Sequence, residues 1–448
     1  MGRGIRRGVG LVLAAVLVSV ASVFAVPQTA HAATTATLGT VYYWNDSLLE
    51  AFRRQGGGPG PLSRAAAMMH GAVFDVLNSA QWARQANLGN GYAAAFTTAE
   101  TSADVDDDLA AGIAARDVLI DALPQQSAYV QQRYSQRHGG AGQAAASALA
   151  DQVVQAVRAN RANDGANTPA GYTPDNVPGA WRPTGGCTPV HPHWGAVRPF
   201  VMTSSAQVRR PAPGFFATYP SLLASTLYTT QLNEVRELGR ADSTSRTPEQ
   251  TQIAFYWAND ANGTYKPPGH LLDHTAVVAL PRFANPIPLA RLFARVSFVL
   301  ADAAIAAWDQ KFRTPIDLWR PIDAIRLAGT DDNPATVPDS TWQPLGATPC
   351  FPAWSAGHAA FAGAWAGVMR QDLGDNVTYT AGTEDPNARG VTRTFTSFTQ
   401  AAAENARSRV YLGVHFQFDN DDGLASGGQI ADLAVTTMSA IRCAKPCA

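Results

Sequence analysis

Three side chains near the end of the chain are spaced so that they can act on one small anion. Arg409, His415 and Asp419 stand six and four residues apart, with Gly413 between the first two. In an unbroken helix, Arg409 and His415 would point about 120° apart and could not hold one ligand. We therefore expect the helix to end at Gly413, because glycine readily adopts the left-handed conformation. Asp419 can then accept one ring N–H of His415 and leave the other nitrogen basic.

A second group of cations follows a long apolar segment that begins near Leu289. It contains Lys311, Arg313 and the Arg320-Pro321 pair. Guanidinium groups bind tetrahedral oxyanions through paired hydrogen bonds, and an ammonium group adds positive charge. This stretch therefore indicates a local anion site in a chain whose overall charge is close to zero.

A third motif places Gly357 and His358 at the start of an expected helix, residues 359–370. The free N–H groups and partial positive charge of a helix N-terminus favour a bound anion. Each motif alone is common in loops. Together they provide what a reaction at an oxyanion needs: cations, helix-end amides, a nucleophilic or ligating imidazole and a proton donor.

These motifs resemble the signature of the superfamily that joins vanadium-dependent haloperoxidases, type 2 phosphatidic acid phosphatases and bacterial acid phosphatases. The Ser-Arg-x5-His-x3-Asp part is matched in full by Ser408, Arg409, His415 and Asp419. Residues 351–361 are similar to the haloperoxidase form of the Gly-His part. Weaker similarity to long, secreted bacterial haloperoxidase-like proteins extends along most of the chain, including residues 68–75 and 194–200.

The resemblance implies a vanadate cofactor, in a site that phosphate can also occupy. His415 would bond the metal axially, Asp419 would orient His415, and His358 would be the acid–base group opposite. The equatorial oxygens would be held by Lys311, Arg320, Arg409 and the amide of Gly357.

Two departures from the family pattern affect this assignment. The family's lysine usually stands seven positions before the arginine, whereas Lys311 stands nine before Arg320. Either Lys311 still reaches the anion, which Trp308-x-x-Lys311 favours, or Arg313 replaces it. Ala356 stands where the family usually has serine, which removes a hydrogen bond worth about 1 kcal/mol. The adjacent Ser355 is expected to point elsewhere.

The function that the resemblance implies is oxidation of halide by hydrogen peroxide. The product, equivalent to a hypohalous acid, would halogenate or oxidise a small organic acceptor, and Phe351 and Trp354 would shape a halide pocket near His358. The alternative is a soluble secreted acid phosphatase, in which His415 attacks a phosphomonoester and His358 protonates the leaving alcohol. A third possibility is a secreted protein that binds phosphate or vanadate without turnover.

Composition and the N-terminus bound the remaining possibilities. The net charge of −1, from 34 basic and 35 acidic residues, provides no global field for nucleic acid or anionic membranes. A basic start, an apolar run and Ala30-His31-Ala32 predict a secretory signal at residues 1–32, with a retained anchor as the alternative. After cleavage we expect an extracellular protein without a membrane segment. Export makes the four cysteines disulfide candidates with three possible pairings, and we expect 187–350 and 443–447.

Helical periodicity dominates the mature chain, including residues 104–122, 126–138 and 141–161, and predicts an all-α protein. Thr247-Pro248-Glu249-Gln250 predicts a helix start with a capping box. We expect a loose leader at residues 33–40, an N-terminal helical region at 33–285 and a C-terminal helical bundle at 286–448 that carries the oxyanion site, all forming one catalytic unit. The resemblance implies helical bundles of the vanadium chloroperoxidase and acid phosphatase type. The Pro- and Gly-rich residues 163–214 predict a long functional loop. In it, His191 and His193 could line a pocket mouth, bind a metal or simply pack, and elsewhere His70 is expected to be a buried structural residue.

Overall fold

The computed structural model describes residues 28–85, 90–168 and 171–442, and it confirms the helical prediction. The α-helices are α1 (Gln28–Gln55), α2 (Pro59–Arg84), α3 (Asp107–Ala122), α4 (Ser127–His138), α5 (Ala144–Arg161), α6 (Tyr219–Leu223), α7 (Thr226–Leu238), α8 (Pro248–Tyr256), α9 (Lys266–Ala279), α10 (Pro286–Phe312), α11 (Pro321–Arg326), α12 (Gly357–Leu373), α13 (Phe398–Tyr411) and α14 (Gln417–Leu433). Two short antiparallel pairs join β1 (Asn90–Tyr92) to β4 (Ala440–Arg442) and β2 (Tyr379–Gly382) to β3 (Thr392–Phe395).

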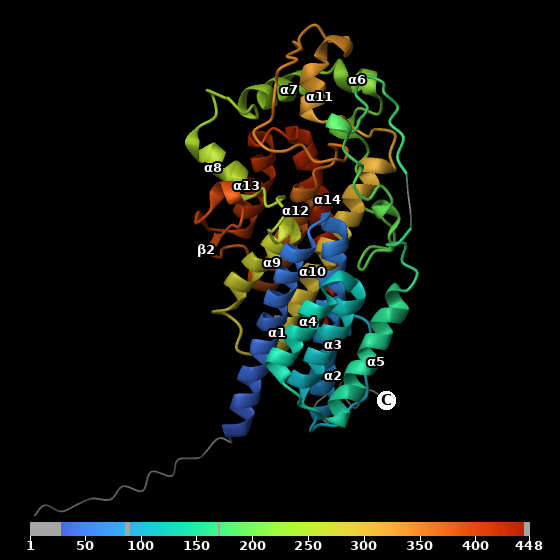
Figure 1. Cartoon of the computed structure of the whole chain (residues 1–448), viewed down its shortest axis with the longest axis vertical. Helices are drawn as coiled ribbons and strands as arrows, with labels where there is room; N and C mark the ends of the chain where they lie inside the picture. The colour runs from blue at the N-terminus through green and yellow to red at the C-terminus, as the bar shows by residue number, and fades with distance from the viewer. Residues whose placement is uncertain (1–27, 86–89, 169–170, 443–448) are drawn as a thin grey trace, which may run out of the picture.

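The helices form two groups along the length of the molecule (Figure 1). Helices α1 to α5 lie together at one end, and α6, α7 and α11 lie at the other. Helix α10 contacts α2 and α1 on one side and α12 and α14 on the other. One apolar cluster extends from Val41 to Met438 and so crosses the predicted boundary between residues 285 and 286. The division into two regions stays a prediction.

Helix α10 organises this core and also holds the long loop that precedes it in sequence. Asn285 caps its start by accepting a hydrogen bond from the N–H of Ile287 (2.9 Å), and prolines occupy the first turn. Farther along, the buried carboxylate of Asp302 accepts the backbone N–H groups of residues 200, 201 and 202 at 2.7–2.8 Å. Within the described residues, 163–214 contain no α-helix or strand. The contacts with Asp302 therefore hold in place a loop that has no regular pattern of backbone hydrogen bonds of its own.

The predicted helix boundaries in the N-terminal half are mostly confirmed. Helices α3, α4 and α5 lie within the three expected segments, and Thr247 caps the start of α8 with the expected reciprocal hydrogen bonds to Gln250. The loose leader at residues 33–40 is wrong, because these residues belong to α1. Thr40 shows why the end of this segment is ordered: it is buried, and its hydroxyl bonds to Asp108 on α3.

The signal and disulfide predictions are only partly within the described residues. Residues 1–27 lie outside them, and residues 28–32 begin α1. The Cys187–Cys350 disulfide is present with the predicted pairing, whereas the 443–447 pair lies outside the described residues. No helix within the described ranges is long and apolar enough to span a membrane.

His70 is a buried structural residue, as expected. It lies at the centre of α2, hydrogen-bonds to Asn45 (3.3 Å) and stacks on Phe293. Burial lowers its pKa to about 3, so the ring is neutral at physiological pH.

Candidate active site

Gly413 ends α13 and turns the chain back, as the spacing predicted. Its φ is +82°, in the left-handed region. The N–H of Val414 bonds to the carbonyl of Arg409 (3.1 Å), and the N–H of Gly413 bonds to that of Val410 (3.0 Å). This pair of bonds is a Schellman motif. A Cβ at Gly413 would lie 2.3 Å from the carbonyl oxygen of Gly239, so only glycine fits here.

The turn brings His415 onto the start of α14, where Asp419 holds it. The ring Nδ1 lies 3.0 Å from Asp419 Oδ2, and both residues are buried. The same oxygen accepts the backbone N–H of Phe416 at 3.0 Å. Because a carboxylate only accepts, Nδ1 carries the proton in the neutral ring and Nε2 presents its lone pair. Burial and the neighbouring Arg320 lower the pKa of His415, whereas burial raises the pKa of Asp419 to about 7.

Arg320 lies directly against this lone pair. It caps α11, is fully buried and donates from Nη1 to His415 Nε2 at 3.0 Å. Its Nη1 also reaches the carbonyl of Val414 (2.8 Å), and Nε reaches the carbonyl of Phe351 (2.7 Å). Nη2 has no partner among the described residues. Arg320 is therefore fixed by backbone oxygens but retains a free donor beside His415.

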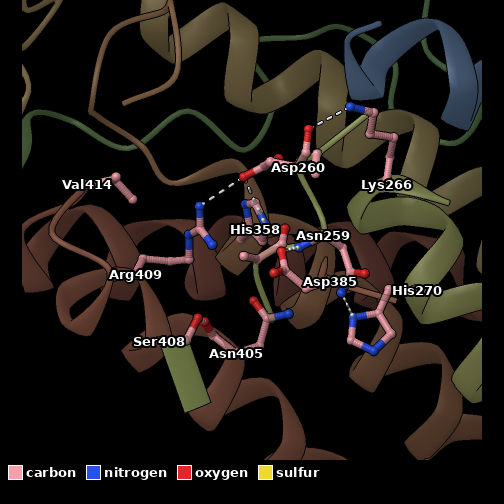
Figure 2. Close-up of polar contacts among 12 residues, drawn as sticks. Asn259, Asp260, Lys266, His270, His358, Asp385, Asn405, Ser408, Arg409 and Val414 are labelled. Carbon is pink, nitrogen blue, oxygen red and sulfur yellow. Dashed lines mark hydrogen bonds and ion pairs between the residues drawn. The ribbon is translucent and has the colours of Figure 1, made fainter. Parts of the chain in front are cut away.

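Arg409 supplies the second buried guanidinium. Its Nη2 donates to Asp260 Oδ2 at 3.1 Å, while Nε and Nη1 have no partner in the described part of the chain. Asp260 is 45% exposed, and its Oδ2 also lies 3.8 Å from His358 Nε2 (Figure 2). One carboxylate from the loop after α8 thus contacts both a predicted anion ligand and the predicted acid–base group.

His358 is the second residue of α12, as the Gly-His motif predicted. Its Nε2 lies 3.0 Å from the carbonyl of Ala258. Since a carbonyl only accepts, Nε2 carries the proton and Nδ1 is left with a lone pair. Burial, followed by the positive charge of Arg409, lowers the pKa of His358 to about 4. Without a bound anion, His358 is therefore neutral at physiological pH.

Lys311 is buried on α10, but its ammonium group is held by the loop before α12. Nζ donates to the carbonyl oxygens of Pro352 (2.7 Å), Ala353 (2.9 Å) and Ser355 (2.6 Å). Burial lowers its pKa, and Arg320 lowers it further. These contacts use all three donors of an ammonium group. Lys311 therefore positions the 352–355 loop directly and can contribute charge to the site.

The structure does not bring Arg313 into this group. Its side chain is 49% exposed, and its Nε lies 3.4 Å from Asp309. Arg313 stands just past the last residue of α10. Of the two candidates for the lysine position, only Lys311 is buried near the other site residues.

The substitution at Ala356 agrees with its surroundings. Ala356 precedes α12 and packs in an apolar cluster with Ala359 and Ala406. The neighbouring hydroxyl of Ser355 does point elsewhere, as expected, because it accepts a hydrogen bond from the amide of Gln310 at 2.6 Å. No serine hydroxyl from positions 355 or 356 therefore faces the predicted anion site.

Four of the predicted residues line a small cavity: Gly357, His358, Arg409 and His415. Lys311, Arg320 and Asp419 are buried but are not among its lining residues. The remaining lining residues are Pro59, Asp260, Pro267, Trp308, Pro349, Phe351 and Phe361. Phe351 is present as expected. Trp354 is not among the lining residues, because its indole N–H bonds to Asp422 (2.9 Å). Trp308 packs against Phe351 at a centroid distance of 4.8 Å.

An outer pocket of about 560 Å³ adjoins this cavity and shares Pro59, Asp260, Pro267, Pro349 and Phe351 with it. His191 lines the outer pocket, which agrees with the pocket-mouth interpretation, but His193 does not line it. Instead, His193 bonds to the carbonyl of Ala166 (3.0 Å). No group of three or more His, Cys, Asp or Glu side chains among the described residues is arranged to hold a metal cation.

The donor set at the inner cavity fits a tetrahedral oxyanion such as vanadate. Arg320 and Arg409 leave three buried guanidinium nitrogens without partners in the described structure, Nη2 of Arg320 and Nε and Nη1 of Arg409. Burying unpaired donors is costly, so such groups indicate a missing acceptor. The lone pair of the neutral His415 ring, on Nε2, lies in the same place and accepts a hydrogen bond from Arg320 Nη1. These groups suit a single oxyanion held by one imidazole. They differ from a metal-cation site, which would be built from several acidic side chains.

Sequence reasoning missed the loop that carries Ala258, Asn259 and Asp260. Asn259 is fully buried, and its side-chain Nδ2 lies within hydrogen-bond distance of three acceptors: His270 Nδ1 (3.0 Å), the Thr383 hydroxyl (2.9 Å) and the carbonyl of Tyr256 (3.1 Å). These bonds fix Asn259 (Figure 2). The residues on either side of it, Ala258 and Asp260, both contact His358. In the sequence, only the residue type of Asn259 pointed to this loop. Asn tolerates a positive φ, and the φ of Asn259 is 44°.

Comparisons with known proteins show similarity in sequence and in fold. Residues 291–442 match the family described as the VCPO second helical-bundle domain. A vanadium chloroperoxidase from Curvularia inaequalis is 27% identical over 285 residues. That alignment covers 49% of this chain, and the chain spans about half (46%) of that relative's length.

Solved structures extend the similarity to the whole fold. The crystal structure described as the first bacterial vanadium-dependent iodoperoxidase aligns with a TM-score of 0.75 and 23% identity, over 91% of this chain and 98% of that one. A holo-type bacterial vanadium-dependent chloroperoxidase aligns with a TM-score of 0.65 and 17% identity, over 84% and 92% of the two chains. At these identities the structures establish a common fold.

Proposed function

Because this chain carries the VCPO second helical-bundle domain and shares its fold with bacterial vanadium haloperoxidases, we propose that it is a vanadate-dependent haloperoxidase. The proposed reaction oxidises halide with hydrogen peroxide to a hypohalous-acid equivalent, which halogenates or oxidises a small organic acceptor. The observation that carries the proposal is the cluster of unpartnered donors of Arg320 and Arg409 beside the lone pair of His415.

Each residue has a distinct part in this proposal. Bound vanadate would supply a Lewis-acidic centre that activates hydrogen peroxide. His415 would hold it through Nε2, with Asp419 keeping the proton on Nδ1. The free N–H groups of Arg320 and Arg409, with the amide of Gly357, would bind its oxygens. Lys311 would act through its charge and through the loop that it holds.

His358 would hold or release a proton at the opposite side of the cavity. In the ligand-free protein its pKa is about 4, so it is a base there. An oxyanion in the cavity adds negative charge next to the ring, which raises the pKa of His358 toward neutrality. His358 can then carry a proton for the peroxide oxygen that leaves as water.

Location is part of the same proposal. The Cys187–Cys350 disulfide supports an oxidising compartment, and we propose that the protein is secreted, with residues 1–32 as its signal. The proposed partners are hydrogen peroxide, a halide and a small organic acceptor, with no nucleic acid and no membrane after cleavage.

The purified protein, titrated with orthovanadate, tests the function directly. We expect vanadate-dependent bromination or chlorination of monochlorodimedone, and we expect His415→Ala to abolish vanadate binding. Hydrolysis of p-nitrophenyl phosphate without halogenation would indicate the phosphatase alternative instead. Absence of both activities with retained vanadate binding would indicate a binding protein. Tight vanadate binding by His415→Ala would contradict the role of His415 as the residue that holds vanadate.

A further inference from the structure

Two buried histidines lie behind the candidate active site and take no part in the proposed chemistry. His270 and His274 are one turn apart on α9, and their ring centroids are 4.6 Å apart. Both rings are buried, and burial lowers the pKa of His270 to about 3, so this ring is neutral. A neutral imidazole has one donor and one acceptor nitrogen, so its partners determine which nitrogen carries the proton.

The two sides of the His270 ring have different partners. Nε2 lies 3.0 Å from the carbonyl oxygen of Gly382, which only accepts, so Nε2 carries the proton. Nδ1 therefore has the lone pair, and it lies 3.0 Å from Nδ2 of Asn259. The rings of Tyr265 and Trp257 pack against His270 at centroid distances of 5.4 and 5.0 Å. The ring of His270 is thus fixed in orientation and presents an acceptor to Asn259.

This acceptor selects one orientation of the Asn259 amide. If the amide were turned over, its oxygen would face the lone pair of His270 Nδ1. In the observed orientation the oxygen accepts the backbone N–H of Glu384 at 3.3 Å. The Thr383 hydroxyl, 2.9 Å from Nδ2, can accept or donate and does not select an orientation by itself. The carbonyl of Tyr256 lies 3.1 Å from Nδ2 but already accepts the Thr383 hydroxyl at 2.7 Å.

The backbone of Asn259 connects this amide to the active site. Its φ of +44° is in the left-handed region, which a residue other than glycine keeps only where its surroundings hold it. On one side, the carbonyl of Ala258 lies 3.0 Å from His358 Nε2. On the other side, Asp260 Oδ2 lies 3.8 Å from the same nitrogen (Figure 2). The orientation of the Asn259 amide therefore affects both groups that contact His358 Nε2.

We propose that His270 is a positioning residue for His358 and that it acts through the side-chain amide of Asn259. His270 holds the loop in the conformation in which the Ala258 carbonyl accepts from His358, and so it keeps the proton of that ring on Nε2. The consequence for turnover rests on the proposed haloperoxidase function. The positioning itself is a property of the vanadate-free protein.

The NMR signals of the His358 ring nitrogens test the positioning without any turnover. They distinguish a nitrogen that carries a proton from one that has a lone pair, and comparison with His358→Gln assigns them. In the vanadate-free native protein at neutral pH, we expect the proton on Nε2 alone. His270→Phe removes the acceptor for Asn259 and should give a mixture of the two tautomers. His270→Asn should retain the native pattern, because its Oδ1 is bonded to Cγ as Nδ1 is.

Two further variants separate positioning from a general loss of stability. His70→Gln alters another buried histidine, which hydrogen-bonds to Asn45 and packs on Phe293. It should leave the His358 signals unchanged. His270→Gln keeps a polar group in the interior but has no acceptor bonded to Cγ. It should give the same mixture of tautomers as His270→Phe, and it replaces that variant in the experiment if His270→Phe does not fold.

Steady-state bromination of monochlorodimedone by the vanadate-loaded enzyme measures the effect on turnover. His270→Phe should lower kcat about tenfold, a loss typical of residues that support a metal site without binding the metal. It should leave the KM for bromide unchanged, and His270→Asn should recover most of the lost kcat.

The outcomes distinguish this inference from the proposed function. If the native protein brominates and His358 keeps its native tautomer in His270→Phe or His270→Gln, the positioning role is overturned and the proposed function stands. The same change of signals in His270→Asn or in His70→Gln would also overturn it, because the acceptor at Nδ1 would then not be the cause. If the signals change as expected but the native protein does not brominate, the proposed function fails and the positioning of His358 stands. An unchanged kcat despite mixed tautomers would overturn the consequence for turnover.

Discussion

One carboxylate oxygen, Oδ2 of Asp419, accepts hydrogen bonds both from the ring Nδ1 of His415 and from the backbone N–H of Phe416, the N-cap residue of α14. The distance is 3.0 Å to each nitrogen. The same contact therefore fixes the tautomer of His415 and the start of the helix that follows it. The position of the lone pair on Nε2 depends on this arrangement.

Replacing Asp419 should therefore weaken anion binding through His415. We expect Asp419→Ala to lower vanadate affinity by about 10- to 100-fold, a loss typical of residues that orient a metal ligand. Asp419→Asn retains an oxygen that can accept the Nδ1–H and should lose less. Calorimetric titration with orthovanadate measures both. Equal affinities for Asp419→Ala and the native protein would show that Asp419 does not position His415.

Lys311 and Arg313 form a matched pair for the lysine position. Lys311→Met leaves three loop carbonyls without their donor, so we expect a loss of about 1–3 kcal/mol in the free energy of unfolding and a lower vanadate affinity. Arg313→Gln alters a half-exposed side chain and should change neither by much. Urea unfolding and vanadate titration of the two variants measure both quantities. A larger loss of affinity in Arg313→Gln would reverse the assignment.

Alanine variants of Gly413 and Gly390 distinguish the cost of a left-handed backbone from the cost of steric overlap. Both have positive φ, +82° and +76°, but only Gly413 has a backbone oxygen in the place of its missing Cβ. Gly390→Ala should cost about 1 kcal/mol, from the left-handed backbone alone. Gly413→Ala must also move the chain that carries His415, so its unfolding free energy and its vanadate affinity should both fall further. Similar stabilities for the two variants would mean that the Gly413 turn can shift freely.

Stability should fall with acidity because several histidines are buried as neutral rings. The pKa of His70 is about 3 in the folded protein against an ordinary value of 6.5. Below pH 6.5 the unfolded chain binds a proton on the His70 ring, whereas the folded chain binds it only near pH 3. The stability that the neutral ring contributes is therefore complete above pH 6.5 and is lost as the pH falls toward 3. At pH 5 this loss is about 2 kcal/mol.

His70→Gln isolates this contribution. Glutamine can keep the hydrogen bond to Asn45 but does not titrate. The difference in unfolding free energy between pH 8 and pH 5, from urea unfolding, should therefore be about 2 kcal/mol smaller in the variant than in the native protein. An unchanged difference would mean that His70 is protonated in the folded state.

Local features of the site could be predicted from the sequence because they depend on neighbours along the chain. The turn at Gly413 follows from the conformational freedom of glycine, and the four-residue step from His415 to Asp419 places both groups at the start of α14. The start of α12 at Gly357 and the capping at Thr247 are equally local. Helical periodicity along the chain, which is also a local property, predicted the all-α fold.

Contacts between distant segments were decided only by the tertiary structure. Whether Lys311 or Arg313 faces the site depends on how α10 packs, and the buried side of α10 contains Lys311. Asp260 and Asn259 carry no motif, yet they touch the site because α8 and its following loop pack against α12 and α13. The physical reason is that hydrophobic burial sets which faces meet, and it is not directional. The polar partners of His358 and Arg409 are therefore fixed by the packing of whole helices rather than by spacing along the chain.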